Sequence, residues 1–262
     1  MKLRVRLFLS GLTLSCLLIV ACDLDRTNPL DPKNPDSYRS MPIVAEVFVN
    51  DDIAIQNEYC DYALTAIENL SDSYTREQLM IVEYHLPYQT KPDNDPNISD
   101  NFIPLYESYA PVPDERGLPD IFLNGTSQRI QGASSLPTVQ ERLKASLASE
   151  SGKKSYLTIE ASLSQSGSNY SISGKIARLG KDDLANAEIT AVLIEDLSRE
   201  NAHFVARFLF SSQTITNLKH SESLDFTLTS SGSTSLTGED VGAIVYVRSI
   251  QNKQIAGAVH LK

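Results

Sequence analysis

The chain has 262 residues and a formal net charge of −10, because 33 Asp and Glu outnumber 23 Lys and Arg. Hydrophobic residues make up 41% and charged residues 21%, which is typical of a folded protein of one or two domains. The acidic balance argues against a nucleic-acid partner, since phosphate binding requires clustered Lys and Arg. With 3 Cys, 4 His and no Trp, the chain offers too few ligands for a zinc cluster, a haem site or a disulfide framework. We therefore expect no metal and no cofactor.

Residues 1–21 have the pattern of a secretory signal peptide. A basic start precedes an apolar run, 7–21, that is shorter than the roughly 20 residues of a membrane-spanning helix. The run ends in Ile19-Val20-Ala21-Cys22, which resembles the bacterial lipobox. In lipoproteins with this motif the cysteine sulfur takes a diacylglycerol and the chain is cut before it. The sequence therefore predicts Cys22 as a lipid anchor to a membrane. An ordinary signal peptide with a chance cysteine is the alternative.

Residues 22–41 are rich in proline and poor in large apolar residues, which predicts an extended tether between the membrane and the folded part. The mature chain then keeps one thiol, because Cys16 leaves with the signal and Cys22 carries the lipid. No intramolecular disulfide can form, so Cys60 is expected to be buried, modified or paired with another molecule.

The segment 42–148 alternates apolar strands with amphipathic helices in the order β-α-β-α-β-β-α. Parallel strands with crossover helices and a late hairpin are expected from this order, with Asn124-Gly125 as the hairpin turn. The arrangement is that of a thioredoxin-like α/β domain. The expected strands are 43–49, 78–86, 120–123 and 128–131, and the expected helices are 59–71, 102–109 and 135 to about 148.

The segment 154–262 follows a linker at 149–153 and changes to an alternation of period two. Short strands separated by Ser, Gly and Asn turns predict a β-sandwich of immunoglobulin size. We therefore expect an α+β protein of two domains with separate cores, thioredoxin-like and then immunoglobulin-like. The expected strands are 157–163, 170–176, 189–194, 204–210, 224–228, 243–247 and 255–261.

A thioredoxin-like order directs attention to the start of the first helix, where a Cys-x-x-Cys pair would lie. Ile67 and Leu70 follow Cys60 by seven and ten residues, the spacing that thioredoxins show after their second cysteine. Asn57 then occupies the place of the attacking cysteine, and an amide cannot attack a disulfide. Pro119 resembles the cis-proline that faces the dithiol in this fold. The sequence favours a structural Cys60, and a reactive Cys60 is the alternative.

The four histidines lie apart from any nucleophile or ligand set in the sequence. His85 follows the second strand, and His203, His220 and His260 lie in the second half. We expect all four to serve packing or to lie on the surface.

Together these features resemble the twenty-eight-kilodalton outer membrane protein family, lipoproteins with a thioredoxin-like domain followed by a β-sandwich. Asn57 and Asp61 depart from the family's Cys-x-x-Cys-Pro stretch. The motifs that carry the resemblance are Ile43–Val49, Tyr59-Cys60, Glu83-Tyr84-His85, Gly117–Gly125, Leu193–Asp196, and the final hairpin of Ala243–Ile250 with Gln254–Leu261.

The resemblance implies an exported protein anchored in the bacterial cell envelope, at the outer rather than the inner membrane. Since the attacking thiol is missing, a non-catalytic binding or structural module is favoured, with a protein or peptide as partner. The alternative is a thiol–disulfide oxidoreductase, or a mixed-disulfide partner, working through Cys60.

Overall fold

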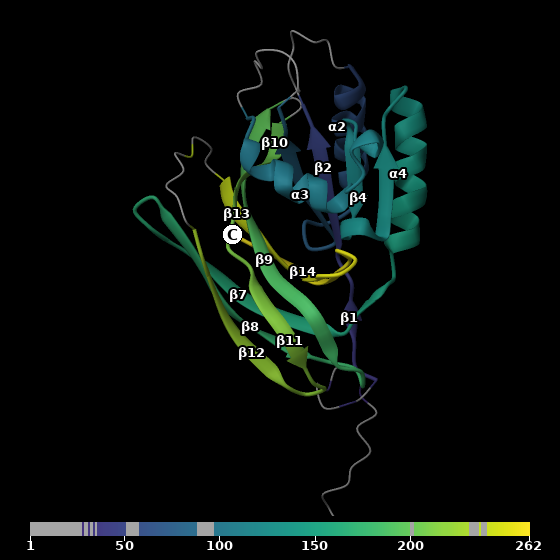
Figure 1. Cartoon of the computed structure of the whole chain (residues 1–262). Helices are drawn as coiled ribbons and strands as arrows, with labels where there is room; N and C mark the ends of the chain where they lie inside the picture. The colour runs from purple at the N-terminus through teal and green to yellow at the C-terminus, as the bar shows by residue number, and fades with distance from the viewer. Residues whose placement is uncertain are drawn as a thin grey trace, which may run out of the picture.

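The computed structural model places a layered α/β half beside an all-β half (Figure 1). It describes residues 28, 31, 34, 36–50, 58–87, 97–199, 202–230, 236 and 240–262. The elements of the first half are β1 (Arg39–Ser40), β2 (Ile43–Val49), α2 (Glu58–Ser71), β3 (Leu79–His85), the 3-10 turn η3 (Asp100–Phe102), α3 (Ile103–Tyr109), η4 (Pro113–Glu115), β4 (Asp120–Leu123), η5 (Gly125–Ser127), β5 (Gln128–Gln131) and α4 (Leu136–Glu150). The elements of the second half are β6 (Lys154–Ser155), β7 (Leu157–Ser166), β8 (Asn169–Arg178), β9 (Leu184–Arg199), β10 (Ala202–Leu209), β11 (Gln213–Leu218), β12 (Ser223–Thr229), β13 (Asp240–Ser249) and β14 (Ile255–Leu261).

The first half has the element order that the sequence predicts. Its four longer strands lie in the order β3-β2-β4-β5. β2 pairs in parallel with β3, and in antiparallel fashion with β4, which turns back into β5. All seven residues of β2 are buried, as expected for a strand covered on both faces.

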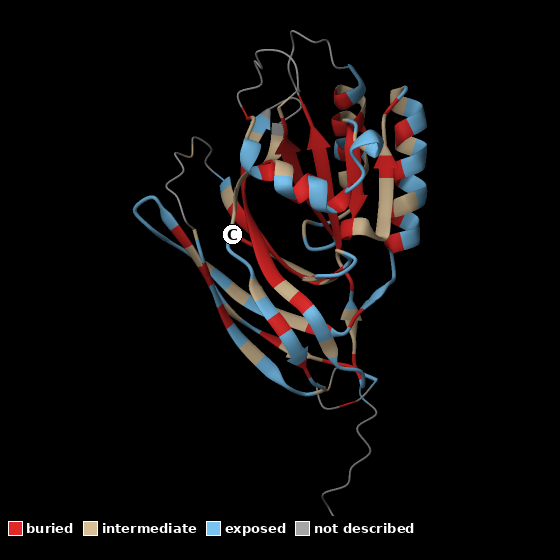
Figure 2. Ribbon diagram, in the orientation of Figure 1, coloured by how far each residue is buried: buried red, intermediate tan, exposed pale blue. Residues whose placement is uncertain are grey.

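Helices α2 and α4 cover one face of this sheet. Alternate residues of β2 from Ile43 to Val49 join a hydrophobic cluster with the inner sides of both helices. α4 contributes Val139, Leu143 and Leu147, which recur every four residues and so share one side of the helix. Figure 2 shows α4 buried on the side that faces the sheet and exposed on the other.

The opposite face carries an aromatic layer. Phe48 stacks on Tyr84 with ring centroids 4.9 Å apart, and it also contacts the rings of Tyr106, Tyr109 and Phe122. The short helix α3 covers only part of this layer. Residues of β9 and β13, including Ile194, Ile244 and Tyr246, join the same hydrophobic cluster and complete the cover.

The second half consists of two sheets that face each other across a hydrophobic cluster. One sheet has the order β12-β8-β7, and the other contains β9 paired with β10, β11 and β13, with β14 beyond β13. Side chains from both sheets meet in the cluster, which includes Leu157, Ile172, Ile189, Val245 and Phe226. The chain is therefore a mixed α/β protein with several sheets, α/β first and then all-β.

The expectation of two separate cores is wrong. β10 pairs in parallel with β3 at Val205 and Glu83, so one sheet runs through both halves. In β9, Val192 and Ile194 pack on the first half, while Ala191 and Leu193 pack on the second-half cluster. Successive side chains of a strand point to opposite faces, so a strand that is apolar throughout can serve two cores at once.

Two pairings lie outside the predicted elements. β11 is a further strand, mostly polar with Ile215 and Leu218 buried, and it pairs with the first part of β9. β1 lies within the segment expected to be tether, and it pairs with β6 through Arg39↔Ser155 and Ser40↔Lys154. The last residues before β2 are thus part of the folded structure.

Candidate functional site

The predicted redox position is only partly within the described residues. Cys22 and Asn57 lie outside them. Cys60 is the third residue of α2, and its side chain is fully buried. It belongs to the hydrophobic cluster between α2, α4 and the sheet, where a cysteine behaves as a small hydrophobic residue.

Pro119 begins the loop into β4, and the Leu118–Pro119 peptide bond is cis, as the sequence predicts. Pro119 is buried, and Leu118 packs on the cluster that contains Cys60. The loop is held by Tyr106, whose hydroxyl accepts a hydrogen bond from the Gly117 backbone N–H at 2.9 Å.

Asp120 fixes the other end of this loop. Its carboxylate accepts hydrogen bonds from Arg129 Nε and Nη2 at 3.0 and 2.7 Å and from the Tyr106 hydroxyl at 3.0 Å. Burial raises the pKa of Asp120, while Arg129 and Tyr106 oppose that rise. Burial and the Asp120 carboxylate raise the pKa of Tyr106 to about 12, so Tyr106 remains a donor. The loop is thus a rigid, internally satisfied structure.

A second polar cluster lies between the halves, around Glu46 at the centre of β2. The Glu46 side chain is fully buried. Tyr109 donates to its Oε2 at 2.7 Å, and Tyr84 and Tyr246 donate to its Oε1 at 3.3 and 3.4 Å. A buried carboxyl group is costly unless it is hydrogen-bonded, and the three phenols meet that requirement. Because Tyr246 belongs to β13, the cluster joins the two halves.

Arg248 adds a positive charge to this cluster. Its Nη1 donates to the Tyr109 hydroxyl at 3.2 Å, and its Nε donates to Glu188 at 2.6 Å. Burial raises the pKa of Glu46, with the Tyr109 hydrogen bond and the Arg248 charge opposing. Glu46 was not among the candidate site residues expected from the sequence. The available signal is one acidic residue inside a strand whose other residues are all apolar.

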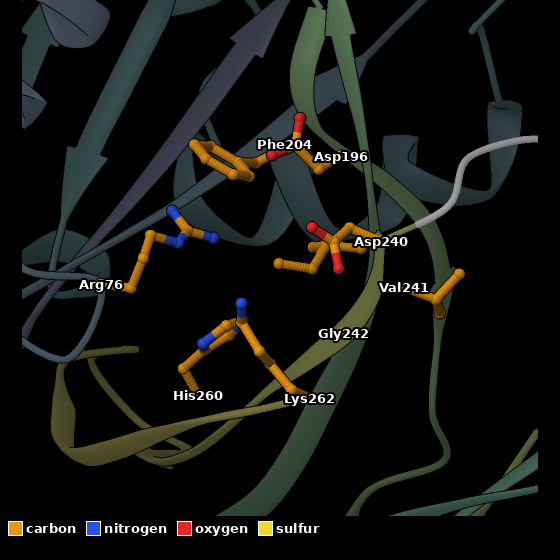
Figure 3. Close-up of a pocket in the computed structure, with 9 residues that line it drawn as sticks. Arg76, Asp196, Phe204, Asp240, Val241, Gly242, His260 and Lys262 are labelled. Atoms are coloured by element: carbon orange, nitrogen blue, oxygen red, sulfur yellow. The ribbon is translucent and has the colours of Figure 1, made fainter.

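A cavity of about 140 Å³ opens where Arg76, from the turn before β3, meets the second-half strands (Figure 3). Arg76, His260 and Lys262 present nitrogen atoms to one side of it, and we call these three residues the basic wall. Asp196 and Asp240 present carboxylates from across the cavity, and we call them the acidic wall.

Arg76 is held by Phe204. The guanidinium carbon lies 3.5 Å from the centroid of the Phe204 ring, which is a close cation–π contact. The Nη1 atom is buried and makes no hydrogen bond to any of the described residues. Burial lowers the pKa of Arg76, and the charge of Asp196 opposes that change.

His260 was expected to serve packing or to lie on the surface, and the structure places it in the basic wall. Burial lowers the pKa of its imidazole, and the positive charges of Arg76 and Lys262 lower it further. The backbone of Gly242 approaches closely, since a Cβ atom at Gly242 would lie 3.0 Å from His260 Nε2. Sequence alone could not find this cavity, because its walls come from four separate segments.

The described part of the chain contains no group of three or more His, Cys, Asp or Glu side chains arranged to hold a metal ion. Within the same residues, no helix is long and apolar enough to cross a membrane.

No family model and no curated protein matches the chain. Among solved structures, HBP35 of Porphyromonas gingivalis matches with a TM-score of 0.57 at 12% identity, covering 84% of this chain and 74% of that one. A domain of the outer membrane lipoprotein Omp28 from Porphyromonas gingivalis gives a TM-score of 0.32 at 19% identity, covering 41% and 88%. Beta-glucosidase 3B from Thermotoga neapolitana gives 0.28 at 13% identity, covering 42% and 16%. Since neither half alone amounts to 84% of the chain, the likeness to HBP35 shows a shared fold that includes both halves.

Proposed function

We propose that this chain is a lipid-anchored bacterial cell-envelope protein that acts as a non-catalytic binding or structural module. In this proposal residues 1–21 are the signal peptide, Cys22 carries the lipid, and the outer membrane is the destination. The folded part combines a thioredoxin-like domain (42–148) with an immunoglobulin-like β-sandwich (154–262) that shares its sheet.

The strand arrangement supports a thioredoxin-like first half. β2 is parallel to β3 and antiparallel to β4, and β5 closes the sheet as a hairpin. Helices α2 and α4 lie on one face, and a cis-proline precedes β4. The two facing sheets around one hydrophobic cluster support the β-sandwich assignment.

The burial of Cys60 is the observation that carries the non-catalytic part of the proposal. Dithiol exchange needs an exposed thiolate that attacks and a second thiol that resolves the mixed disulfide. The side chain of Cys60 has no exposed surface, and position 57 is asparagine. A thiol in this position cannot meet a polypeptide disulfide while the protein is folded.

The anchoring part rests on the sequence Ile19-Val20-Ala21-Cys22. Several acyl chains on one cysteine hold a protein firmly to a bilayer, whereas a single chain binds only marginally. A binding module on such an anchor acts near the membrane surface, within a distance that the length of its tether sets.

An insulin-reduction assay with dithiothreitol tests the proposal. We expect the wild type and Cys60→Ala to be equally inactive, with a bacterial thioredoxin as the positive control. Asn57→Cys supplies the missing thiol, and we expect it to form a disulfide with Cys60. Turnover by the wild type that disappears in Cys60→Ala would establish the alternative, a thiol–disulfide oxidoreductase.

A further inference from the structure

Arg76, which lines the cavity, carries a buried donor that makes no hydrogen bond to the described residues. A buried charged donor without an acceptor costs more free energy than a neutral one, because it has lost its water and gained no partner. Nη1 of Arg76 is such a donor, and the stack on Phe204 holds the guanidinium in place. Nη1 has almost no accessible surface, so an occupant of the cavity would pair with the other guanidinium nitrogens, whose orientation the stack on Phe204 fixes.

The basic wall is suited to a carboxylate. The Arg76 guanidinium can give parallel hydrogen bonds to two oxygens of one carboxylate, and the Lys262 ammonium adds charge on the same side. His260 can donate one further hydrogen bond in its neutral form. Three basic groups at one cavity are notable in a chain of net charge −10.

The acidic wall argues against a simple anion as the occupant. Asp196 and Asp240 would repel a second carboxylate or a phosphate but would attract an ammonium group. The Asp196 carboxylate is already oriented, since its Oδ1 accepts a hydrogen bond from the Ser198 backbone N–H at 2.8 Å. Ile194 and Phe204 line the space between the walls, while the Val241 side chain points away from it, so the body of the occupant meets apolar side chains from β9 and β10.

We propose that this cavity binds a small zwitterion of the amino-acid class, with the carboxylate at the basic wall and the ammonium at the acidic wall. The volume of about 140 Å³ is well below the roughly 300–1,000 Å³ of pockets for drug-sized ligands, which limits the occupant to a single small molecule. This inference rests on the proposed function in one respect, namely that the module binds a ligand.

The test uses thermal unfolding of the full mature protein in detergent, with calorimetric titration of any compound that raises Tm. A ligand that binds only the folded state raises the unfolding temperature with its concentration. The probes are neutral amino acids from glycine to phenylalanine, with L-leucine as the reference compound. 4-Methylpentanoate lacks the amino group of leucine, and 3-methylbutylamine lacks its carboxylate. We expect at least one amino acid to bind about tenfold or more tightly than the analogue that lacks its amino group and the analogue that lacks its carboxylate.

Four variants locate the binding. Lys262→Gln and Asp240→Asn each remove a charge from one wall without touching the stack on Phe204, and we expect each to weaken binding by about tenfold. Arg76→Gln should abolish binding, and its Tm without ligand reports any loss of folding. Lys144→Gln, on the exposed side of α4, should bind as the wild type does.

Three outcomes would overturn the proposal. They are no binding by any amino acid, equal binding by the carboxylate-only compound, and binding that survives in both wall variants. None of these results would affect lipid labelling of Cys22 or the absence of insulin reduction, so the proposed function would be judged separately.

Discussion

Tyr109 donates a 2.7 Å hydrogen bond to Glu46, and both side chains are buried between the two halves of the chain. The bond joins the end of α3 to the centre of β2. Tyr246 of β13 donates to the same carboxyl group from the second half. Since one acidic group holds partners from both halves, its protonation state affects the stability of the whole fold.

Replacing Glu46 with glutamine should change how stability depends on pH. Burial raises the pKa of Glu46 in the folded state above its ordinary value of 4.5. The stabilising contribution of Glu46 is therefore fully present below about pH 4.5 and is lost as pH rises through the folded-state pKa. Glutamine cannot ionise, so the free energy of unfolding of wild type minus that of Glu46→Gln should fall with rising pH. The slope cannot exceed about 1.4 kcal/mol per pH unit. Urea unfolding from pH 4 to pH 8 measures it.

Glu150→Gln is the matched control, for which the stability difference between wild type and variant should depend on pH in the opposite direction. Burial acts to raise the pKa of Glu150, but hydrogen bonds from Lys153 and Asn124 prevail and hold it below 4.5. Its contribution is therefore present above that pH and is lost as pH falls through the folded-state pKa. If the free energy of unfolding of wild type minus that of Glu46→Gln stayed constant or grew with pH, the pKa of Glu46 would not be raised in the folded protein.

Gly125→Ala should destabilise the fold far more than Gly132→Ala. Both glycines have positive φ, +63° and +68°, so each alanine carries a backbone penalty of about 1–2 kcal/mol. A Cβ at Gly125 would also overlap the Lys253 carbonyl oxygen, whereas Gly132 faces open space. We expect at least about 2 kcal/mol of additional loss for Gly125→Ala, because backbone must move to relieve the overlap. Equal losses in urea unfolding would show that the turn and the β13–β14 loop are not packed together.

The second half should not fold alone, because β9 and β13 present apolar residues on both faces. A fragment of residues 151–262 would expose Ile194, Ile244 and Tyr246, which are covered by the first half. We expect the fragment to aggregate or to lack a cooperative unfolding transition, while the full chain unfolds in one step. A soluble, monomeric fragment with its own sharp transition would restore the interpretation of two separate cores.

Cys22→Ser should abolish lipid labelling and move the protein from the membrane fraction to a soluble or unprocessed pool. The hydroxyl of serine cannot form the thioether that carries the diacylglycerol. Cys16→Ser removes the other cysteine of the first 22 residues and should leave labelling and membrane partition unchanged. Membrane partition and labelling that persist in Cys22→Ser would refute the lipoprotein interpretation.

The first half was predictable because its elements have local signals. The inner side of α4 repeats every four residues, and Asn124-Gly125 marks the turn, with Asn124 and Gly125 both at positive φ. The positions of Ile67 and Leu70, seven and ten residues after Cys60, also favoured a structural thiol, and Cys60 is buried. Such patterns involve residues that are close together in the sequence, so one sequence is enough to recognise them.

The shared sheet could not be predicted in the same way. The apolar runs at 189–194 and 243–247 indicate strands covered on both faces, but they do not identify what covers the second face. Likewise, the tyrosines that donate hydrogen bonds to Glu46 lie on β3, α3 and β13. The residues that line the cavity beside Arg76 also come from separate segments of the chain. Contacts between residues that lie far apart in the sequence leave no local pattern.

The reactivity of Cys60 in the folded protein tests the central claim most directly. In the variant Cys16→Ser with Cys22→Ser, Cys60 is the one remaining thiol, and its rate of reaction with a disulfide reagent such as dithionitrobenzoate can be followed alone. We predict that labelling in native buffer is limited by unfolding, and that it becomes rapid in denaturant. Labelling of the native protein at the rate of an exposed cysteine, independent of unfolding, would contradict the account of a non-catalytic module.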